Sequence, residues 1–125
     1  MNLVLDAGVF IALDNGDATT RARFAAARAR GIGLVTTSPI VAQVWRDGRR
    51  QAMLARFLAA TRIEAPDEPA ARRAGELVGK ARTSDVVDAL LVGVARDGDT
   101  ILTSDPDDLA ALVAASRVRA AIVRV

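Results

Sequence analysis

The chain has 125 residues, of which 51% are hydrophobic and 26% are charged, a balance typical of a single globular domain spanning residues 1–125. It contains no cysteine and no histidine, which excludes a disulfide framework, zinc sites of the usual kind and catalytic triads built on histidine. The net charge is +2, and the pI near 10.3 reflects how little titrates between the carboxylates and the single lysine. No signal peptide or membrane-spanning stretch is evident, so we expect a cytoplasmic protein that does not enter a membrane.

The basic residues are unevenly distributed along the chain. Residues 1–62 hold nine arginines and four acidic residues, whereas residues 63–125 hold eight basic and eleven acidic residues. Arginine forms bidentate contacts with phosphate and accounts for all but one of the basic residues. A GC-rich coding bias would produce the same preference, so charge alone does not identify a nucleic-acid-binding protein.

Short apolar runs alternate with amphipathic stretches along the whole chain. The first run, Leu3-Val4-Leu5, is typical of a strand buried on both faces in the middle of a parallel sheet. Asp17 and Ser38 have the character of residues that begin helices, and Gly48 that of a residue that ends one. We expect strands within 1–6, 32–36, 61–65, 99–103 and 120–125, and helices at 8–13, 17–30, 38–47, 49–59, 70–80, 86–96 and 106–115. This alternation predicts an α/β fold with a mostly parallel central sheet of about five strands, covered on both faces.

Large apolar residues are concentrated in the predicted helices at 38–47 and 49–59, and they are Trp45, Met53, Leu54, Phe57 and Leu58. They provide more apolar surface than one small sheet needs, which predicts that part of it forms a symmetric dimer contact. The alternative is that all five lie in the core of the monomer, because large residues are scarce elsewhere.

Aspartates occur where two predicted strands end and where one helix begins. Asp6 follows the first strand, Asp105 follows the fourth, and Asp85 and Asp88 open the helix at 86–96. Each of them, or a serine beside it, could simply cap a helix. Capping, however, does not require several carboxylates to end at one edge of a sheet, where ligands bind in parallel α/β folds. Clustered carboxylates without histidine or cysteine indicate a site for Mg²⁺ or Mn²⁺ and metal-assisted phosphoryl chemistry.

Three segments, in this order, resemble the acidic motifs of a PIN domain: LVLDAG at 3–8, TSDVVDAL at 83–90 and ILTSDPDDL at 101–109. More closely, the chain is similar to VapC-type toxins of bacterial type II toxin–antitoxin systems. The resemblance implies a PIN-like three-layer α/β/α sandwich and a Mg²⁺-dependent endoribonuclease that cuts tRNA or rRNA. It also implies a homodimer that is inhibited by a cognate antitoxin protein.

The resemblance assigns roles to five aspartates in this sequence. On the family's pattern Asp6, Asp88 and Asp105 fall on the metal-binding positions, and Asp85 and Asp108 are additional members of the acidic cluster. No side chain in the chain is a natural general base near neutral pH, so the metal would have to activate the attacking water.

One position departs from the family's pattern. The family usually places a glutamate on the helix after the second strand, and Gln43 occupies that position here. Its amide oxygen can still ligate a metal or orient a water, but it carries no charge, so Mg²⁺ should bind more weakly. On the predicted helix at 38–47, Asp47 lies one turn beyond Gln43, from where it could supply the missing charge through a water.

Two further questions concern what the chain binds. Arg46, Arg49 and Arg50 are candidates for contacts with the RNA backbone, or else they form a solvated surface. The alternative to a nuclease is a degenerate PIN module that binds RNA or an antitoxin without efficient cleavage, with Gln43 as the sign of lost activity. A receiver-like or phosphatase domain is disfavoured, because a receiver needs a lysine late in the chain and the only lysine is Lys80.

Overall fold

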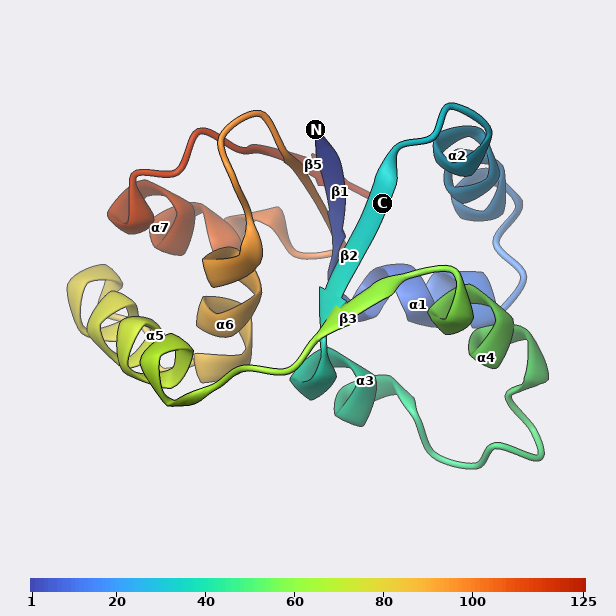
Figure 1. Ribbon diagram of the computed structural model, residues 1–125, viewed down its shortest axis with the longest axis horizontal. Helices are drawn as coiled ribbons and strands as arrows, with labels where there is room; N and C mark the ends of the chain where they lie inside the picture. The colour runs from blue at the N-terminus through green and yellow to red at the C-terminus, as the bar shows by residue number, and fades with distance from the viewer.

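The computed structural model describes residues 1–125 and contains one five-stranded sheet in which every pairing is parallel (Figure 1). The strand order across the sheet is β3-β2-β1-β4-β5. The strands are β1 (Asn2–Leu5), β2 (Gly33–Thr37), β3 (Arg62–Glu64), β4 (Thr100–Thr103) and β5 (Ala121–Arg124).

Helices cover both faces of this sheet. They are α1 (Ala7–Asp14), α2 (Ala18–Ala29), α3 (Ser38–Val44), α4 (Ala52–Ala59), α5 (Glu68–Ala81), α6 (Val86–Val94) and α7 (Pro106–Ser116). In Figure 1, α5, α6 and α7 lie to one side of the sheet, and α1, α2 and α4 lie to the other. The predicted three-layer α/β/α sandwich with a parallel sheet is confirmed. None of the helices combines the length and the apolar composition needed to cross a membrane.

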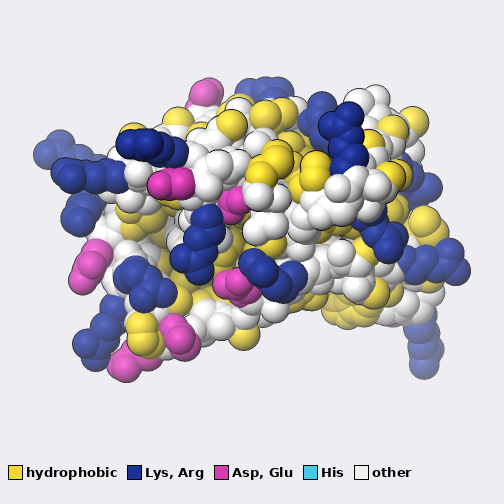
Figure 2. Space-filling view, turned by 45° about the horizontal axis from the view of Figure 1, so that its top comes forward, with side chains coloured by type: hydrophobic (Ala, Val, Ile, Leu, Met, Phe, Trp, Pro, Cys, Tyr) yellow, Lys and Arg dark blue, Asp and Glu magenta, His cyan; other side chains and the backbone are white.

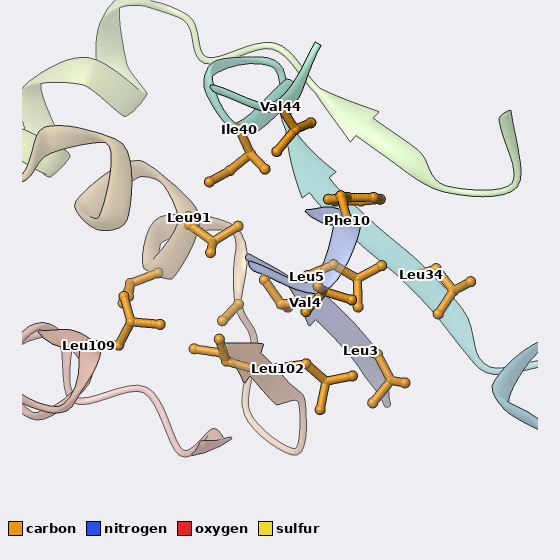
Figure 3. Close-up of a cluster of buried hydrophobic side chains, with 14 of the residues drawn as sticks. Leu3, Val4, Leu5, Phe10, Leu34, Ile40, Val44, Leu91, Leu102 and Leu109 are labelled. Carbon is orange, nitrogen blue, oxygen red and sulfur yellow. The ribbon is translucent and has the colours of Figure 1, made fainter. Parts of the chain in front are cut away.

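The first strand lies at the centre of the sheet, with β2 on one side and β4 on the other. Val4 and Leu5 are almost completely buried, as expected for a strand covered on both faces. Figure 3 shows them among apolar side chains from both helical layers, including Phe10 of α1 and Leu91 of α6. The all-apolar run at the N-terminus is therefore the middle of the hydrophobic core.

Most helix boundaries follow the local signals in the sequence. The side chains of Asp17, Asp67 and Asp85 accept hydrogen bonds from backbone N–H groups three residues further on, at 2.9, 2.9 and 3.0 Å. Of the two residues expected to cap α6, the cap is Asp85. Gly31 follows α2 with a positive φ of 70°, a conformation that glycine adopts without strain.

The end of α3 differs from the prediction. The helix ends at Val44 rather than at position 47, and α4 begins at Ala52 rather than at position 49. The side-chain amide of Gln51 explains the difference, since it donates to the carbonyl of Val44 at 2.9 Å and accepts from the backbone of Arg46 at 2.7 Å. These bonds satisfy backbone groups that a longer helix would have paired internally. Gly48 has no positive φ, so it does not end a helix.

The large apolar residues near α4 divide between the core and the surface. Leu54 and Leu58 are buried in the core, whereas Met53 and Phe57 are partly exposed. The Phe57 ring packs edge-on against Phe24 of α2, with ring centroids 5.0 Å apart. Trp45 keeps 37% of its surface exposed and lies beyond the end of α3, not on an apolar stripe of that helix. The alternative, that all five residues lie in the core of the monomer, is wrong, and a dimer stays a prediction.

Charge is distributed unevenly over the surface. On the face shown in Figure 2, the visible acidic side chains lie in the left half, whereas basic side chains spread over both halves. The left half carries α5, α6 and α7, which come from the acidic second part of the chain. On this face, the charge asymmetry between residues 1–62 and 63–125 is therefore also an asymmetry in space.

Candidate functional site

Polar residues form a row across the carboxyl edge of the sheet. The register pairs Thr37 of β2 with Glu64 of β3, and Thr103 of β4 with Arg124 of β5. Continuing the register of β1 with its two neighbours places Asp6 between Thr37 and Thr103. Residues in register on parallel strands point to the same face of the sheet. Asp6 is thus in the middle of a polar row, at the place where parallel sheets bind ligands.

The carboxylate of Asp6 is held on both oxygens. Its Oδ1 accepts a hydrogen bond from the backbone N–H of Ala7 at 2.8 Å, and its Oδ2 accepts one from the hydroxyl of Thr103 at 2.6 Å. The residue is 9% exposed, and its backbone N–H donates to the carbonyl of Leu102 at 3.0 Å. Asp6 does cap α1, as the simpler interpretation holds, but only one of its oxygens serves that purpose.

Asp88 has a strongly perturbed acidity. Partial burial, the charges of Asp85 and Asp6, a hydrogen bond with Asp85 and the charge of Asp108 together raise its pKa from 3.8 to about 7. Burial makes the largest contribution, because it disfavours the charged carboxylate, and the neighbouring negative charges act in the same direction. Four of the five predicted aspartates are therefore close enough for their charges to interact, and a cation among them would relieve the repulsion.

Asp105 has a different environment. It is exposed at the start of α7, and its side chain makes no capping hydrogen bond. Its charge is not among those that raise the pKa of Asp88. Its backbone N–H donates to the hydroxyl of Thr103 at 3.0 Å, and that hydroxyl in turn donates to Asp6. Thr103 therefore ties the position of Asp105 to that of Asp6.

The donor set has the chemistry of a site for Mg²⁺ or Mn²⁺, because it consists of carboxylates alone. Burial and the neighbouring negative charges also raise the pKa of one of them, Asp88. As the side chains stand, no three of them are close enough together to hold one ion. Asp105 and Asp108 are exposed and their side chains make no hydrogen bond, whereas Asp85 is held by its cap on α6 and Asp6 is fixed on both oxygens. Ion binding would therefore require the exposed carboxylates to turn toward Asp6 and Asp88.

Gln43 lies on α3 with an exposed side chain that makes no hydrogen bond. Asp47 lies in the loop after α3, where it accepts from the backbone of Arg49 at 3.0 Å and lies 3.8 Å from Arg50. The idea that Asp47 continues the helix one turn beyond Gln43 is wrong, since α3 ends at Val44.

The three candidate RNA-binding arginines all lie in the loop between α3 and α4. Arg46 donates to the carbonyls of Ala42 at 2.9 Å and Trp45 at 2.7 Å, so its guanidinium helps to close the end of α3. The guanidinium of Arg49 has no partner in the protein, and that of Arg50 has only its distant pairing with Asp47. Arg49 and Arg50 are therefore the better placed of the three to contact a ligand.

The sequence interpretation did not single out two threonines that matter at this edge. Thr103 binds Asp6 and Asp105, and Thr37 is 1% exposed with a hydroxyl that has no hydrogen-bond partner. Each lies at the last position of a strand next to the central one. Both follow a short apolar run, which is a weak signal, and the strand pairing that brings them beside Asp6 is not contained in the local sequence.

The arrangement of the sheet and helices is that of a PIN-like α/β/α sandwich. The chain is similar to a chain in the crystal structure of VapBC2 from Rickettsia felis bound to a DNA fragment from their promoter, with a TM-score of 0.71. The match covers 100% of this chain and 99% of the other at 12% sequence identity, which demonstrates a shared fold. No protein-family model and no curated protein sequence matches the chain.

Proposed function

We propose that the chain is a Mg²⁺-dependent endoribonuclease and the toxin of a type II toxin–antitoxin pair, cutting structured RNA such as tRNA or rRNA in the cytoplasm. One observation carries this proposal. In a PIN-like sandwich, the fixed carboxylate of Asp6 lies at the carboxyl end of the central strand, within electrostatic reach of Asp88, whose pKa is raised to about 7. Such an edge suits phosphodiester hydrolysis better than any other chemistry that these residue types allow.

Each residue has a definite role in this proposal. Asp6, Asp88, Asp105 and Asp108 would hold Mg²⁺ or Mn²⁺, with Asp85 beside them, and the ion would supply activation of the attacking water. Thr103 holds the Asp6 carboxylate in one orientation. Asp85 anchors the first turn of α6 through the backbone of Asp88, and Arg49 and Arg50 contact the RNA backbone.

The proposed partners follow from the same fold. The similar structure is described as a VapBC2 complex on promoter DNA, which supports an antitoxin partner for this chain as well. A short neighbouring reading frame that encodes a small DNA-binding protein would support this assignment, and co-purification of its product with the chain would test it. The homodimer is tested by sedimentation, and a monomer at micromolar concentration would contradict it.

The nuclease is tested with purified protein and a structured RNA, in Mg²⁺ and in EDTA. We expect cleavage that depends on Mg²⁺ and is lost in Asp6→Asn, since that variant keeps the side-chain size but removes a fixed charge. Asp107→Asn is the matched control, because Asp107 is an exposed acid on α7 that does not affect the pKa of Asp88. Equal cleavage by the parent and Asp6→Asn would contradict the proposal.

Gln43 favours one alternative, a PIN module that binds RNA or an antitoxin without cutting. The missing glutamate charge, together with the absence of three closely grouped carboxylates, would leave the ion weakly held. In that case RNA would bind to the purified chain without cleavage at any Mg²⁺ or Mn²⁺ concentration.

A further inference from the structure

A cleft of about 670 Å³ runs between α5 and α6 and reaches the end of α7. Its other side is formed by the end of β2 and the loop after β3, on the side of the sheet where Figure 1 shows these three helices. Aliphatic side chains make up much of its wall, among them Ala74 and Leu77 of α5 and Ala89 and Leu90 of α6. Its volume is in the range of sites that bind small molecules or single nucleotides.

Thr37 is the only buried polar residue that lines this cleft. Its hydroxyl is the one buried side-chain polar atom in the chain without a hydrogen-bond partner. The neighbouring Thr36 and the equivalent Thr103 on β4 both donate, at 2.8 and 2.6 Å. Buried hydroxyls are nearly always paired, so an unpaired one on a residue that lines a cleft indicates a group that a ligand completes.

The cleft adjoins the acidic edge of the sheet. Thr37 lies next to Asp6 in the polar row, and Ala89 directly follows Asp88 on α6. Asp88 itself does not line the cleft, because it lies on the opposite face of α6 from Leu90 and Gly93. A ligand that places a phosphate at the acidic edge could therefore place an adjoining group in the cleft.

The charges around the cleft favour a ligand that carries phosphate. Three basic side chains line it without any ion pair or hydrogen bond, and they are Arg73, Lys80 and Arg96. Two of its three acids are already engaged, since Glu64 lies 3.2 Å from Arg62 and Asp67 caps α5. Of the three acids, only Glu76 has neither an ion pair nor a hydrogen bond. The unpaired charge around the cleft is therefore mostly positive.

We propose that this cleft is a base-binding subsite, which takes one nucleotide of the RNA next to the phosphate that is cut. The inference rests on the proposed nuclease function and names how that site would select its substrate. The base packs between the aliphatic walls, and the Thr37 hydroxyl, which both donates and accepts, bonds its edge. Arg73, Lys80 and Arg96 contact the backbone of the flanking nucleotides.

A larger side chain at position 93 tests the subsite by filling the cleft. Gly93 lines the cleft, and a Cβ added there would meet no atom within 4 Å. Gly93→Leu should weaken binding of a non-cleavable RNA oligonucleotide in EDTA by about tenfold or more. Gly75→Leu is the matched control, because Gly75 is also helical and unobstructed but does not line the cleft. Thermal unfolding of both variants establishes that each is folded.

A second pair of variants tests the hydroxyl. Thr37→Val keeps the shape of the side chain. It should weaken binding of the oligonucleotide severalfold and change which base is preferred beside the cut. Thr36→Val removes an equally buried hydroxyl that is already bonded inside the protein, and should lower stability without changing base preference. Unchanged affinity in Gly93→Leu together with unchanged preference in Thr37→Val would overturn the proposal.

Titration with each of the four nucleoside monophosphates, followed by NMR of the leucine methyl groups, separates this inference from the proposed function. Shifts at Leu77 and Leu90 that disappear in Gly93→Leu would support the subsite even if the parent cuts no RNA. Mg²⁺-dependent cleavage by the parent, with the same KM and the same cut sites in Gly93→Leu, would support the nuclease and overturn the subsite.

Discussion

The hydroxyl of Thr103 donates a 2.6 Å hydrogen bond to Oδ2 of Asp6, joining two residues that are 97 positions apart in the chain. The same hydroxyl accepts from the backbone N–H of Asp105 at 3.0 Å. The hydroxyl therefore acts both as a donor and as an acceptor, and it holds the end of β1 against the end of β4. Because Thr103 is completely buried, water cannot replace either bond.

Thr103→Val should therefore destabilise the protein by about 1–3 kcal/mol, since it leaves a buried carboxylate oxygen without its donor. It should also weaken the stabilisation by Mg²⁺, because Asp6 is no longer fixed. Urea unfolding with and without Mg²⁺ measures both effects. Thr100→Val on the same strand is the control, as the Thr100 hydroxyl makes no hydrogen bond, and an equal loss in the two variants would contradict a special role for Thr103.

The stability of the metal-free protein should depend on pH through Asp88. Its pKa is raised from 3.8 in a free side chain to about 7 in the folded protein, so the folded state binds this proton more tightly. The resulting stability is fully present below pH 3.8 and is lost as the pH rises through about 7. In EDTA, the melting temperature of the parent should fall over this interval relative to that of Asp88→Asn.

Comparison with Asp88→Asn is needed because other groups also make the stability depend on pH. The hydrogen bonds from Thr20 lower the pKa of Asp17, and that contribution to stability is lost as the pH falls, in the opposite sense. Since Asp17 is unchanged in the variant, its effect cancels in the difference. A difference in melting temperature that stays constant between pH 4 and pH 8 would show that Asp88 has an ordinary acidity.

Gly8 should tolerate no larger residue, because a Cβ there would collide with the side chain of Ser104, whose own Cβ would be 2.8 Å away. This close approach brings the start of α1 against the junction of β4 and α7, near both Asp6 and Asp105. Gly8→Ala should destabilise the protein by about 1–3 kcal/mol. Ser104→Gly in the same chain should recover most of the loss, and a double-mutant cycle measures the coupling. Strict additivity would mean that the two residues do not touch.

The sequence predicts the sheet well, because its signals are local. The all-apolar run ending at Asp6 indicated a central strand, and capping residues such as Asp17 and Asp85 marked where helices begin. The alternation of the two kinds of segment then allowed little besides a parallel sheet with helices on both faces.

The sequence misleads where a side chain reaches across a loop. Trp45 continues an apolar stripe and Gly48 resembles a helix-ending glycine, so a helix to position 47 was the natural prediction. The amide of Gln51, seven positions beyond Val44, ends the helix earlier. Such a bond depends on how the loop folds back, and no local pattern of propensity contains it.

The threonines at the carboxyl edge were missed for a different reason. Thr37 and Thr103 flank Asp6 only because β1 pairs with both β2 and β4, and that pairing depends on strand order. The sequence could suggest that Asp6 and Asp105 end at one edge. It contains no signal for the register that decides which hydroxyl faces which carboxylate.

The charge at position 43 should set the strength of the proposed metal site. Gln43→Glu adds one negative charge on α3 and keeps the size of the side chain, which is exposed and makes no hydrogen bond. The fold should therefore be undisturbed. If Gln43 borders the ion, the Mg²⁺ concentration needed for half-maximal cleavage should fall by about tenfold, which corresponds to ~1.4 kcal/mol of added attraction.

Asp47→Asn is the informative control for this change. Asp47 lies outside α3, and its carboxylate accepts a hydrogen bond from the backbone N–H of Arg49. Asp47 therefore does not replace the missing charge at position 43. Its loss should leave the Mg²⁺ dependence unchanged in both the parent and the Gln43→Glu background. A weaker response to Mg²⁺ in Asp47→Asn alone, restored by Gln43→Glu, would show instead that the loop after α3 moves toward the acidic edge when the ion binds.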